Sequence, residues 1–260
     1  MLNNPTLLID GDMLLYKACA AVEREVRWDD SNHVLFSNAE EAYEAFQHSL
    51  SKVCLDITPL TTGVLGYRIA FSGSGESNFR RKLYPEYKAG RSRKPLCYSH
   101  LLGLILDSEP ASRVDTLEGD DLLGIWATNG KCHNPIIVSD DKDMRTVPGW
   151  LYRQGELTQV SKEQADYNWL LQTLTGDATD GYPGLPGCGP VTAEKLLNRM
   201  PDGPVDPEIS HTEWRWDLIV QAYEAKGLTE DDALLQARLA RILRASDWDS
   251  ERKEVILWNP

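Results

Sequence analysis

Short apolar runs of strand length alternate with longer stretches of helical period across residues 1–161 of this chain. We expect strands at Thr6–Ile9, Val64–Phe71, Arg113–Leu117, Pro135–Ser139, Leu151–Arg153 and Leu157–Val160. We expect helices at Met13–Glu25, from a capping box at Ser37 and Glu40 to about Leu55, at Tyr98–Leu106 and at Gly119–Asn129. Strands that alternate with helices predict an α/β fold, with a twisted, mainly parallel sheet flanked by helices.

The pattern becomes helical after Ser161. The helices we expect there are Lys162–Leu174, Val191–Met200, Thr212–Ala225 and Thr229–Ala245. The chain therefore divides into an α/β domain over 1–161 and a helical region over 162–260, with Pro201–Pro207 as the best linker candidate. Within the first part, Val26–Phe36 is expected to form a hairpin.

The charge of the chain is distributed unevenly. Lys and Arg total 27 and Asp and Glu total 40, and a net charge of −13 by itself counts against a polyanionic partner. Seven of the 27 basic residues nevertheless lie between Asn78 and Lys94, where Phe79, Tyr84 and Tyr87 are interleaved with them. Aromatic side chains among cations suit base stacking combined with phosphate contact, although a solvated charged segment is the plainer alternative.

Other classes of protein are excluded by composition. The five cysteines are scattered and never form a C-x-x-C pair, which argues against a disulfide framework or a zinc ribbon and for the reducing cytoplasm. The most apolar uncharged run, Leu101–Leu106, is far shorter than the roughly 20 residues that span a bilayer, so no membrane role is expected. Residues Met1–Pro5 show no basic start of a secretory signal.

Acidic residues follow three of the predicted strands. Asp10 follows the first strand, Glu118 the strand that ends at Leu117, and Asp141 and Asp143 the strand that ends at Ser139. Because ligands bind outside the carboxyl ends of the strands in an open α/β sheet, these carboxylates should lie together. Oxygen ligands without His or Cys indicate Mg²⁺ or Mn²⁺. Taken alone, the cluster at Asp10 is more often a turn, and the clusters at Glu118 and Asp141 fit acids at a helix start.

A glycine-rich loop, Thr175–Pro190, separates two predicted helices. Its glycines allow close approach of another backbone, and Pro190 suits the first turn of the next helix. Exposed amides at a helix N-terminus bind phosphate, whereas the plainer reading is a helix–helix turn. Nothing in the loop is suited to reading bases.

Five motifs in order resemble the 5′-nuclease superfamily of flap endonucleases and 5′–3′ exonucleases. Within it, the chain looks most like the small exonuclease of T-odd, short-tailed bacteriophages. The motifs are Leu7–Asp12, Asn78–Arg91, Glu118–Asp121, Ser139–Asp143 and Thr175–Pro190, and together they extend over most of the chain.

The resemblance implies a PIN-like 5′-nuclease fold with a helical arch over about 76–95 and a helix–three-turn–helix over about 162–200. It implies two Mg²⁺ or Mn²⁺ ions and a K⁺ ion at the helix–three-turn–helix. The implied metal ligands are Asp10, Glu118, Asp120, Asp121, Asp141, Asp143, Asp177 and Asp180. The implied catalytic cations are Lys17, Lys88 and Arg91. The implied DNA contacts are Arg80, Arg81, Lys82, Tyr87, Arg93, Lys94, Gly187 and Gly189, with Tyr87 stacking on the terminal base.

One departure from the family pattern lies after Phe71, where the family has an Asp and this sequence reads Ser72-Gly73-Ser74-Gly75-Glu76. Either Glu76 replaces the missing carboxylate or a water takes its place.

The resemblance implies a metal-dependent 5′–3′ exonuclease that hydrolyses duplex DNA with a free 5′ end to 5′-phosphorylated products. It also implies action on 5′ flaps and on RNA–DNA hybrids, for a phage enzyme in the host cytoplasm. Three alternatives stay open: a structure-specific flap endonuclease, an RNA-cutting endonuclease of the PIN type, and a DNA-end-binding protein with a decayed site.

Overall fold

The computed structural model describes residues 1–29, 32–63, 65–199 and 210–260. The linker candidate Pro201–Pro207 and the expected start and end of two elements, Val64 and Met200, lie outside these ranges.

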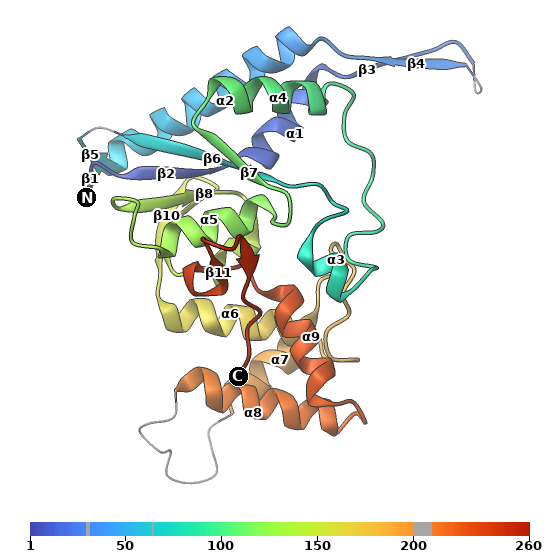
Figure 1. Cartoon of the computed structure of the whole chain (residues 1–260), viewed down its shortest axis with the longest axis vertical. Coiled ribbons are helices and arrows are strands. Elements are labelled where there is room, and N and C mark those ends of the chain that lie inside the picture. Colours follow the sequence, from blue (N-terminus) through green and yellow to red (C-terminus); the bar gives the residue numbers. More distant parts are fainter. Residues whose placement is uncertain (30–31, 64, 200–209) are drawn as a thin grey trace.

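A six-stranded sheet forms the centre of the α/β part, in the order β10-β9-β8-β2-β6-β7 (Figure 1). Its strands are β2 (Thr6–Asp10), β6 (Gly66–Ser72), β7 (Ala111–Val114), β8 (Pro135–Val138), β9 (Gly149–Arg153) and β10 (Glu156–Val160). Neighbouring strands are parallel except β9 and β10. The prediction of a mainly parallel α/β sheet is confirmed.

Helices cover both faces of this sheet. Leu7 and Ile9 of β2 pack with α1 (Gly11–Val22), α2 (Ala39–Ile57) and α4 (Tyr98–Ser108), whereas Leu8 packs on the other face with α5 (Gly119–Thr128). Because side chains of a strand alternate between the faces and both faces are covered, the central strand reads as an unbroken apolar run.

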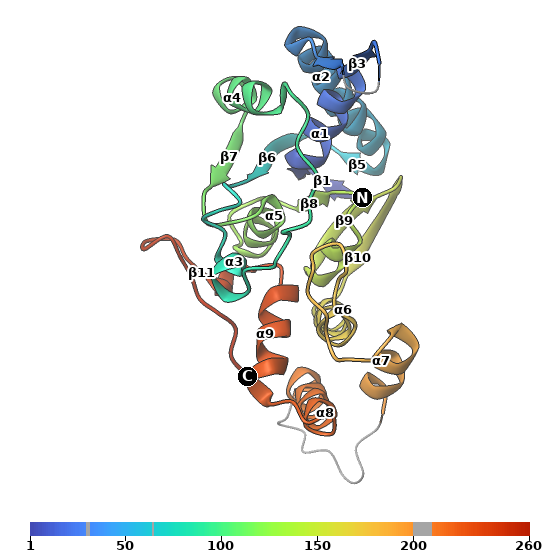
Figure 2. The same ribbon diagram turned by 90° about the vertical axis from the view of Figure 1, so that its right-hand side faces the viewer.

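The helical region lies beneath the sheet and has its own core (Figures 1 and 2). It contains α6 (Lys162–Thr175), α7 (Pro190–Leu197), α8 (His211–Glu224) and α9 (Glu230–Ala240). Further short elements are β1 (Leu2–Asn3), η1 (Thr58–Leu60), β5 (Thr61–Thr62), η2 (Lys142–Thr146), η3 (Ala245–Asp247), β11 (Trp248–Asp249) and β12 (Glu254–Val255). Among the described helices, none combines the length and the apolar character needed to cross a membrane.

Several predicted boundaries are wrong. The helix expected to Ala245 ends at Ala240, because Arg241 leaves it to pair with Asp247. The strand expected at Arg113–Leu117 is β7, and the chain already turns after Val114, whose carbonyl accepts the N–H of Leu117. Helix α2 is capped by Asn38 rather than Ser37, since the Asn38 side chain accepts the N–H groups of Glu40 and Glu41.

The segment expected to form a helical arch contains one short helix, α3 (Phe79–Leu83). Its remainder, to residue 95, consists of turns and extended chain. Pro85 and Pro95 each lack a backbone N–H, and Gly90 disfavours a helix. The basic segment therefore crosses the sheet edge as an irregular strap.

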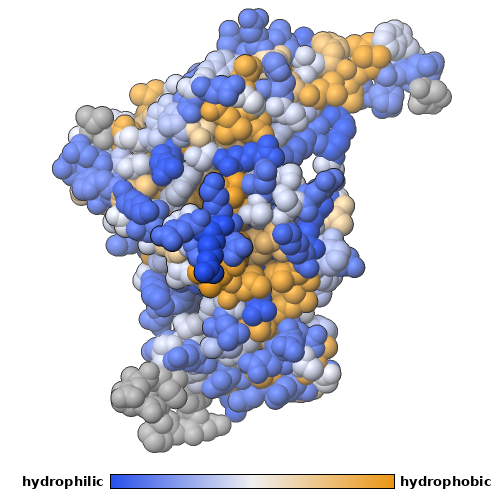
Figure 3. Space-filling view, in the orientation of Figure 1, coloured by the Kyte–Doolittle hydropathy of each residue, from blue (hydrophilic) through white to orange (hydrophobic). Residues whose placement is uncertain are grey.

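The predicted hairpin is present as β3 (Arg24–Arg27) and β4 (His33–Phe36), and it projects from the end of α1 (Figure 1). Figure 3 shows apolar surface along this arm, where Val26, Trp28, Val34 and Phe36 are between 41% and 68% exposed.

Candidate active site

Acidic side chains from four parts of the chain line two adjoining cavities of about 200 and 480 Å³. Asp10 ends β2, Glu118 and Asp120 begin α5, Asp141 and Asp143 follow β8, and Asp177 and Asp180 lie in the glycine-rich loop. Seven of the eight residues predicted as metal ligands thus line the same pair of cavities. The parallel sheet accounts for this convergence, because β2 and β8 end at the same edge.

One half of the site holds carboxylates that repel one another. Burial raises the pKa of Asp10 to about 6, and Asp12 and Asp141 add to the rise, although Ser139 Oγ donates to Asp10 Oδ2 at 2.7 Å. Burial likewise raises the pKa of Asp120 well above its usual range, and the charges of Asp10 and Asp141 act in the same direction. This half of the site therefore favours a bound cation or proton.

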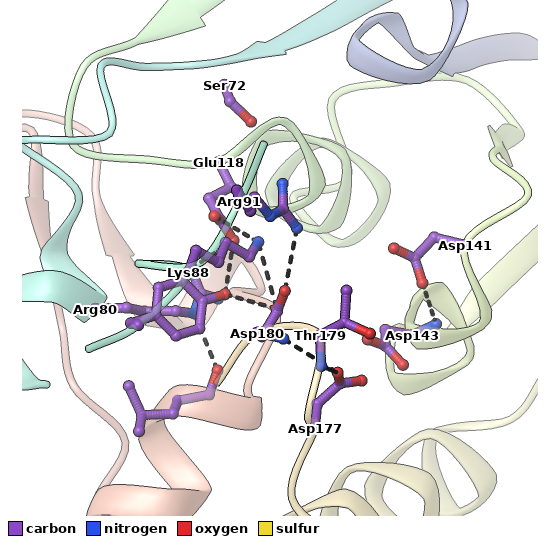
Figure 4. A network of polar contacts seen from close by, with 12 residues as sticks. Ser72, Arg80, Lys88, Arg91, Glu118, Asp141, Asp143, Asp177, Thr179 and Asp180 are labelled. Carbon is purple, nitrogen blue, oxygen red and sulfur yellow. Dashed lines mark hydrogen bonds and ion pairs between the residues drawn. The ribbon is translucent and has the colours of Figure 1, made fainter. Parts of the chain in front are cut away.

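The other half of the site is neutralised by the basic strap (Figure 4). Lys88 Nζ lies 2.6 Å from Glu118 Oε1 and 3.3 Å from Asp180 Oδ2, and Arg91 Nη2 lies 3.1 Å from Asp180 Oδ1. Burial alone would raise the pKa of Glu118, but Lys88 and Arg80 lower it to about 2. The same contacts raise the pKa of Lys88 against the opposing effect of its burial.

Backbone contacts fix the strap to the glycine-rich loop. The N–H of Lys88 donates to the Asp180 carbonyl at 2.8 Å, and a Cβ on Gly181 would come within 3.2 Å of the Glu86 carbonyl oxygen. Lys88 itself adopts a φ of 55°, a conformation that is unfavourable for an L residue. Its contacts with the glycine-rich loop and with the site acids offset this cost. The two predicted cations, Lys88 and Arg91, are thereby aimed into the site.

The loop acids form a smaller group beside Lys142. Asp177 Oδ1 accepts the N–H groups of Thr179 and Asp180, and its Oδ2 lies 3.2 Å from Lys142 Nζ. Burial alone would raise the pKa of Asp177, but these contacts together hold it below its usual value. Burial and the charge of Asp141 raise the pKa of Asp143 to about 6. The sequence analysis did not select Lys142, although its position between two site acids is a signal for it.

The side chains that could bind a metal suit a hard divalent cation, because the described residues that line the two cavities include Asp and Glu but neither His nor Cys. Among the residues that the structure describes, however, no three His, Cys, Asp or Glu side chains stand together as a set that could hold a metal ion. The mutual repulsion of Asp10, Asp120 and Asp141 is the observation in favour of one.

Two predicted site residues form a buried structural pair instead. Arg80 donates from Nη1 and Nη2 to the two oxygens of Asp121, at 2.8 and 2.7 Å, and also to the carbonyls of Leu239 and Arg241. Asp121 has no exposed surface and Arg80 has 2%. In this structure Asp121 is therefore engaged with Arg80 rather than with the cavities, whereas Arg80 also lines the smaller cavity. The metal-ligand role of Asp121 and the DNA contact of Arg80 stay predictions.

Tyr87 lines both cavities, and its predicted base-stacking role stays a prediction, because its ring is largely buried in this structure. Tyr87 is 2% exposed and packs in the core of the helical region, and its hydroxyl lies 3.0 Å from both Glu118 Oε2 and Asp180 Oδ2, to either of which it can donate. Its burial makes it a support for the site acids. The aromatic residue of the larger cavity that is exposed is Tyr16 of α1, with 49% of its surface accessible.

The remaining predicted cations occupy varied positions. Lys17, Arg81 and Lys94 line the larger cavity, with Lys94 Nζ 4.0 Å from the centre of the Tyr98 ring and Arg81 donating to the carbonyls of Tyr87 and Lys88. Lys17 pairs with Asp140 at 3.0 Å. Outside the cavities, Arg93 pairs with Glu23 at 2.6 Å, and Lys82 is exposed.

The strand end that lacks the family Asp is occupied by Ser72. The N–H of Ser72 donates to Asp12 Oδ2 at 2.8 Å, and Ser72 Oγ accepts the N–H of Gly119. Glu76 is exposed and is not among the described residues that line the cavities. The carboxylate nearest this strand end is therefore Asp12, which Tyr98 holds through a 2.6 Å hydrogen bond.

The glycine-rich loop leaves its final turn open to solvent. Hydrogen bonds fold the loop back on α6, with Leu185 N–H donating to the Leu174 carbonyl at 2.9 Å. Beyond this point Gly187 and Gly189 are exposed, and a Cβ on either would meet open space. Helix α7 then starts at Pro190. This turn has the form expected of a backbone-phosphate site.

Comparison with known proteins gives consistent matches. The family model for the N-terminal, resolvase-like domain of 5′-3′ exonucleases matches residues 5–162. The exodeoxyribonuclease of Enterobacteria phage T3 is 31% identical, covering 98% of this chain and 92% of that one. The exonuclease of Escherichia phage T7 is also 31% identical, covering 98% and 93%. A flap endonuclease of bacteriophage T5, solved with DNA and metal ions, is 14% identical with a TM-score of 0.48, covering 92% and 99%.

Proposed function

This chain belongs to the 5′-3′ exonuclease family, and on that premise we propose that it degrades duplex DNA from a free 5′ end in a divalent-metal-dependent reaction. The observation that carries the proposal is the convergence of seven predicted acids on two adjoining cavities that Lys88 and Arg91 also line. Carboxylates beside cations fit a site that holds both metal ions and a phosphodiester.

Asp10, Asp120 and Asp141 are the residues that would hold a divalent cation first, because burial and the charges of Asp10 and Asp141 raise the pKa of Asp120, and the charge of Asp141 adds to the raised pKa of Asp10. Glu118, Asp143, Asp177 and Asp180 would complete a site for two Mg²⁺ or Mn²⁺ ions. Bound there, the ions supply an acidified attacking water and stabilisation of the leaving 3′ oxygen. Because the 3′ oxygen would be the leaving group, each product would carry the phosphate on its 5′ end.

Lys88 and Arg91 bind the scissile phosphate in this proposal. Both cations already point into the cavities, where they pair with Glu118 and Asp180. A phosphate that enters exchanges these partners for its own oxygens, so the cations stabilise the charge that grows in the transition state. Lys17 and Lys94 would guide the strand at the rim of the larger cavity.

The duplex would rest on the open turn at Gly187 and Gly189, whose amides contact the DNA backbone without reading sequence. A K⁺ ion at the same turn is part of the proposal. Exposed Lys82 and Arg93 would contact phosphates near the strap, along with Arg81 of the cavity rim. Action on 5′ flaps and on RNA–DNA hybrids, in DNA replication and host DNA degradation within a host cytoplasm, completes the proposed role.

The test compares a 5′-labelled linear duplex with a covalently closed circle, in Mg²⁺ and in chelator. The variant is Asp141→Asn, and its matched control is Asp140→Asn, since Asp140 is adjacent and, unlike its partner Lys17, is not among the described residues that line the cavities. We expect release of label from the linear duplex only, dependent on metal, lost in Asp141→Asn and retained in Asp140→Asn.

Other results would redirect the proposal. Cleavage of the closed circle would indicate an internal endonuclease. Faster cleavage of a 5′-flap substrate than of a blunt duplex would indicate a flap endonuclease. Binding of DNA ends without cleavage in Mg²⁺ or Mn²⁺ would indicate a non-catalytic DNA-end-binding protein.

A further inference from the structure

A separate cavity of about 490 Å³ lies at the opposite end of α6 from the glycine-rich loop. Helix α6 has 14 residues, so about 21 Å separates its two ends. The cavity is bounded by the start of α6, the start of α8, the turn after α9 and the C-terminal tail. Its lining residues differ from those of the two cavities described above.

Three cations line this cavity, and two of them are buried. Arg241 and Arg244 are 8% and 7% exposed, whereas Lys162 stands at the rim. Two buried carboxylates oppose them: Asp166 accepts Arg244 Nη1 at 2.6 Å and Lys162 Nζ at 2.8 Å, and Asp247 accepts Arg241 Nε at 2.8 Å. A further carboxylate on the lining, that of Glu213, accepts the N–H of Ser210. The two buried arginines are therefore each paired with one buried carboxylate.

Arg244 is paired with Asp166, but one of its donors is unmatched. Its Nε has no hydrogen-bond partner within the part of the chain that the structure describes, although the side chain is more than nine-tenths buried. A buried donor without a partner is uncommon in folded proteins and points to a missing acceptor. Burial also lowers the pKa of Arg244, and the charge of Arg241 lowers it further. An anion in the cavity would accept a hydrogen bond from Arg244 Nε and would stabilise the charged form of this side chain.

An aromatic group stands beside these cations. Trp258 packs edge-on against Trp169 and Trp216, with ring centres 4.7 and 4.9 Å apart, and all three line the cavity. The hydroxyl residues Ser210 and Ser246 lie on the same lining. Buried cations beside aromatic rings favour a ligand that has both an anionic and a flat aromatic part.

We propose that this cavity binds a small phosphate monoester with an aromatic base, of the nucleoside monophosphate class. Its phosphate lies toward Arg241, Arg244 and Lys162, and its base against the tryptophans. The volume of about 490 Å³ falls within the range of about 300–1,000 Å³ usual for small-molecule sites. The site is distinct from the candidate active site, so this proposal does not depend on the reaction assigned there.

The test is equilibrium dialysis of the whole chain against radiolabelled dAMP. Chelator is present, so that metal-dependent binding at the candidate active site is suppressed. The test variants are Lys162→Glu and Ser246→Glu, because both positions are exposed and neither substitution removes a buried charge. Lys52→Glu on α2 is the matched control for charge reversal, and Lys88→Ala monitors the candidate active site. Thermal unfolding of each variant checks that the fold is retained.

We expect dAMP to bind wild type, Lys52→Glu and Lys88→Ala alike, and its Kd to rise at least tenfold in Lys162→Glu and Ser246→Glu. Deoxyadenosine should compete poorly, and inorganic phosphate should compete less well than unlabelled dAMP. The proposal would be overturned if wild type did not bind dAMP, if both glutamate variants bound it with the wild-type Kd, or if Lys88→Ala lost binding. Equal competition by inorganic phosphate would overturn the assignment of the base.

Discussion

Asp120 and Asp121 are adjacent in the sequence, and the structure gives them opposite roles that one pair of substitutions can separate. Asp121 Oδ2 accepts from Arg80 Nη1 and from the N–H of Glu118. Asp121 Oδ1 accepts from Arg80 Nη2 and from the N–H of Leu243. In Asp121→Asn the new amide nitrogen therefore faces two donors in either orientation, and the charge of Arg80 is left unpaired.

Removing one partner of a buried ion pair costs about 3–5 kcal/mol. At about 2–4 °C of Tm per kcal/mol for chains of this size, Asp121→Asn should lower the Tm by roughly 6–20 °C. Asp120→Asn should leave the Tm unchanged or raise it in chelator, because burial and the charges of Asp10 and Asp141 disfavour the ionised Asp120. Its cleavage rate should fall by at least about 10², the usual effect of losing a group that stabilises the transition state.

The assay combines thermal unfolding in chelator with single-turnover cleavage of a linear duplex, measured well below the lower Tm. Arg80→Met serves as a second probe, since it should destabilise the protein about as much as Asp121→Asn, and the double variant should lose less than the sum. Asp121→Asn with wild-type Tm and cleavage as slow as Asp120→Asn would refute the structural role of Asp121.

Lys88→Ala should lower the cleavage rate by about 10²–10³ in a single-turnover assay, because Lys88 points into the site, and the exposed control Lys52→Ala on α2 should cleave at the wild-type rate. Gly189→Ala should weaken duplex binding several-fold in a titration while the Tm stays unchanged, because the new Cβ meets no protein atom but covers the amides proposed to contact DNA; wild-type affinity would argue against that contact. Burial raises the pKa of Asp10 and of Asp143 from 3.8 to about 6, so the folded state binds more protons than the unfolded state within this window. The contribution of these two groups to the free energy of unfolding in chelator should therefore fall as the pH rises from 3.8 to about 6. In denaturant titrations, the stability of wild type relative to Asp10→Asn should fall over this range.

The predictable part of the fold is the part that local patterns determine. The run Leu7–Ile9 is apolar because β2 is covered on both faces, so its strand character and the parallel sheet follow from the sequence. The convergence of Asp10 and Asp141 follows in turn, because their parallel strands end at one edge. The end of the last long helix was less predictable, since the pairing of Arg241 with Asp247 replaces a helical pattern that continues in the sequence.

The roles of individual charged residues depend on contacts between distant parts of the chain. Arg80 stands in a run of exposed-looking cations, but its partners Asp121 and Leu239 lie 41 and 159 residues away. Tyr87 likewise looks available for stacking until the helical region closes around it. A motif identifies the residue types of such a site, whereas burial decides which of them can reach a substrate.

The candidate site therefore has two electrostatic halves with different consequences. Glu118 and Asp180 already have cationic partners in the strap, so a ligand there must compete with Lys88 and Arg91. Asp10, Asp120 and Asp141 form no ion pair among the described residues, and their repulsion favours entry of a cation without prior rearrangement. Since a phosphate would bind the same strap cations, its arrival would free Glu118 and Asp180 for ligation. Cation and DNA binding should then strengthen each other, because each removes the partner that opposes the other.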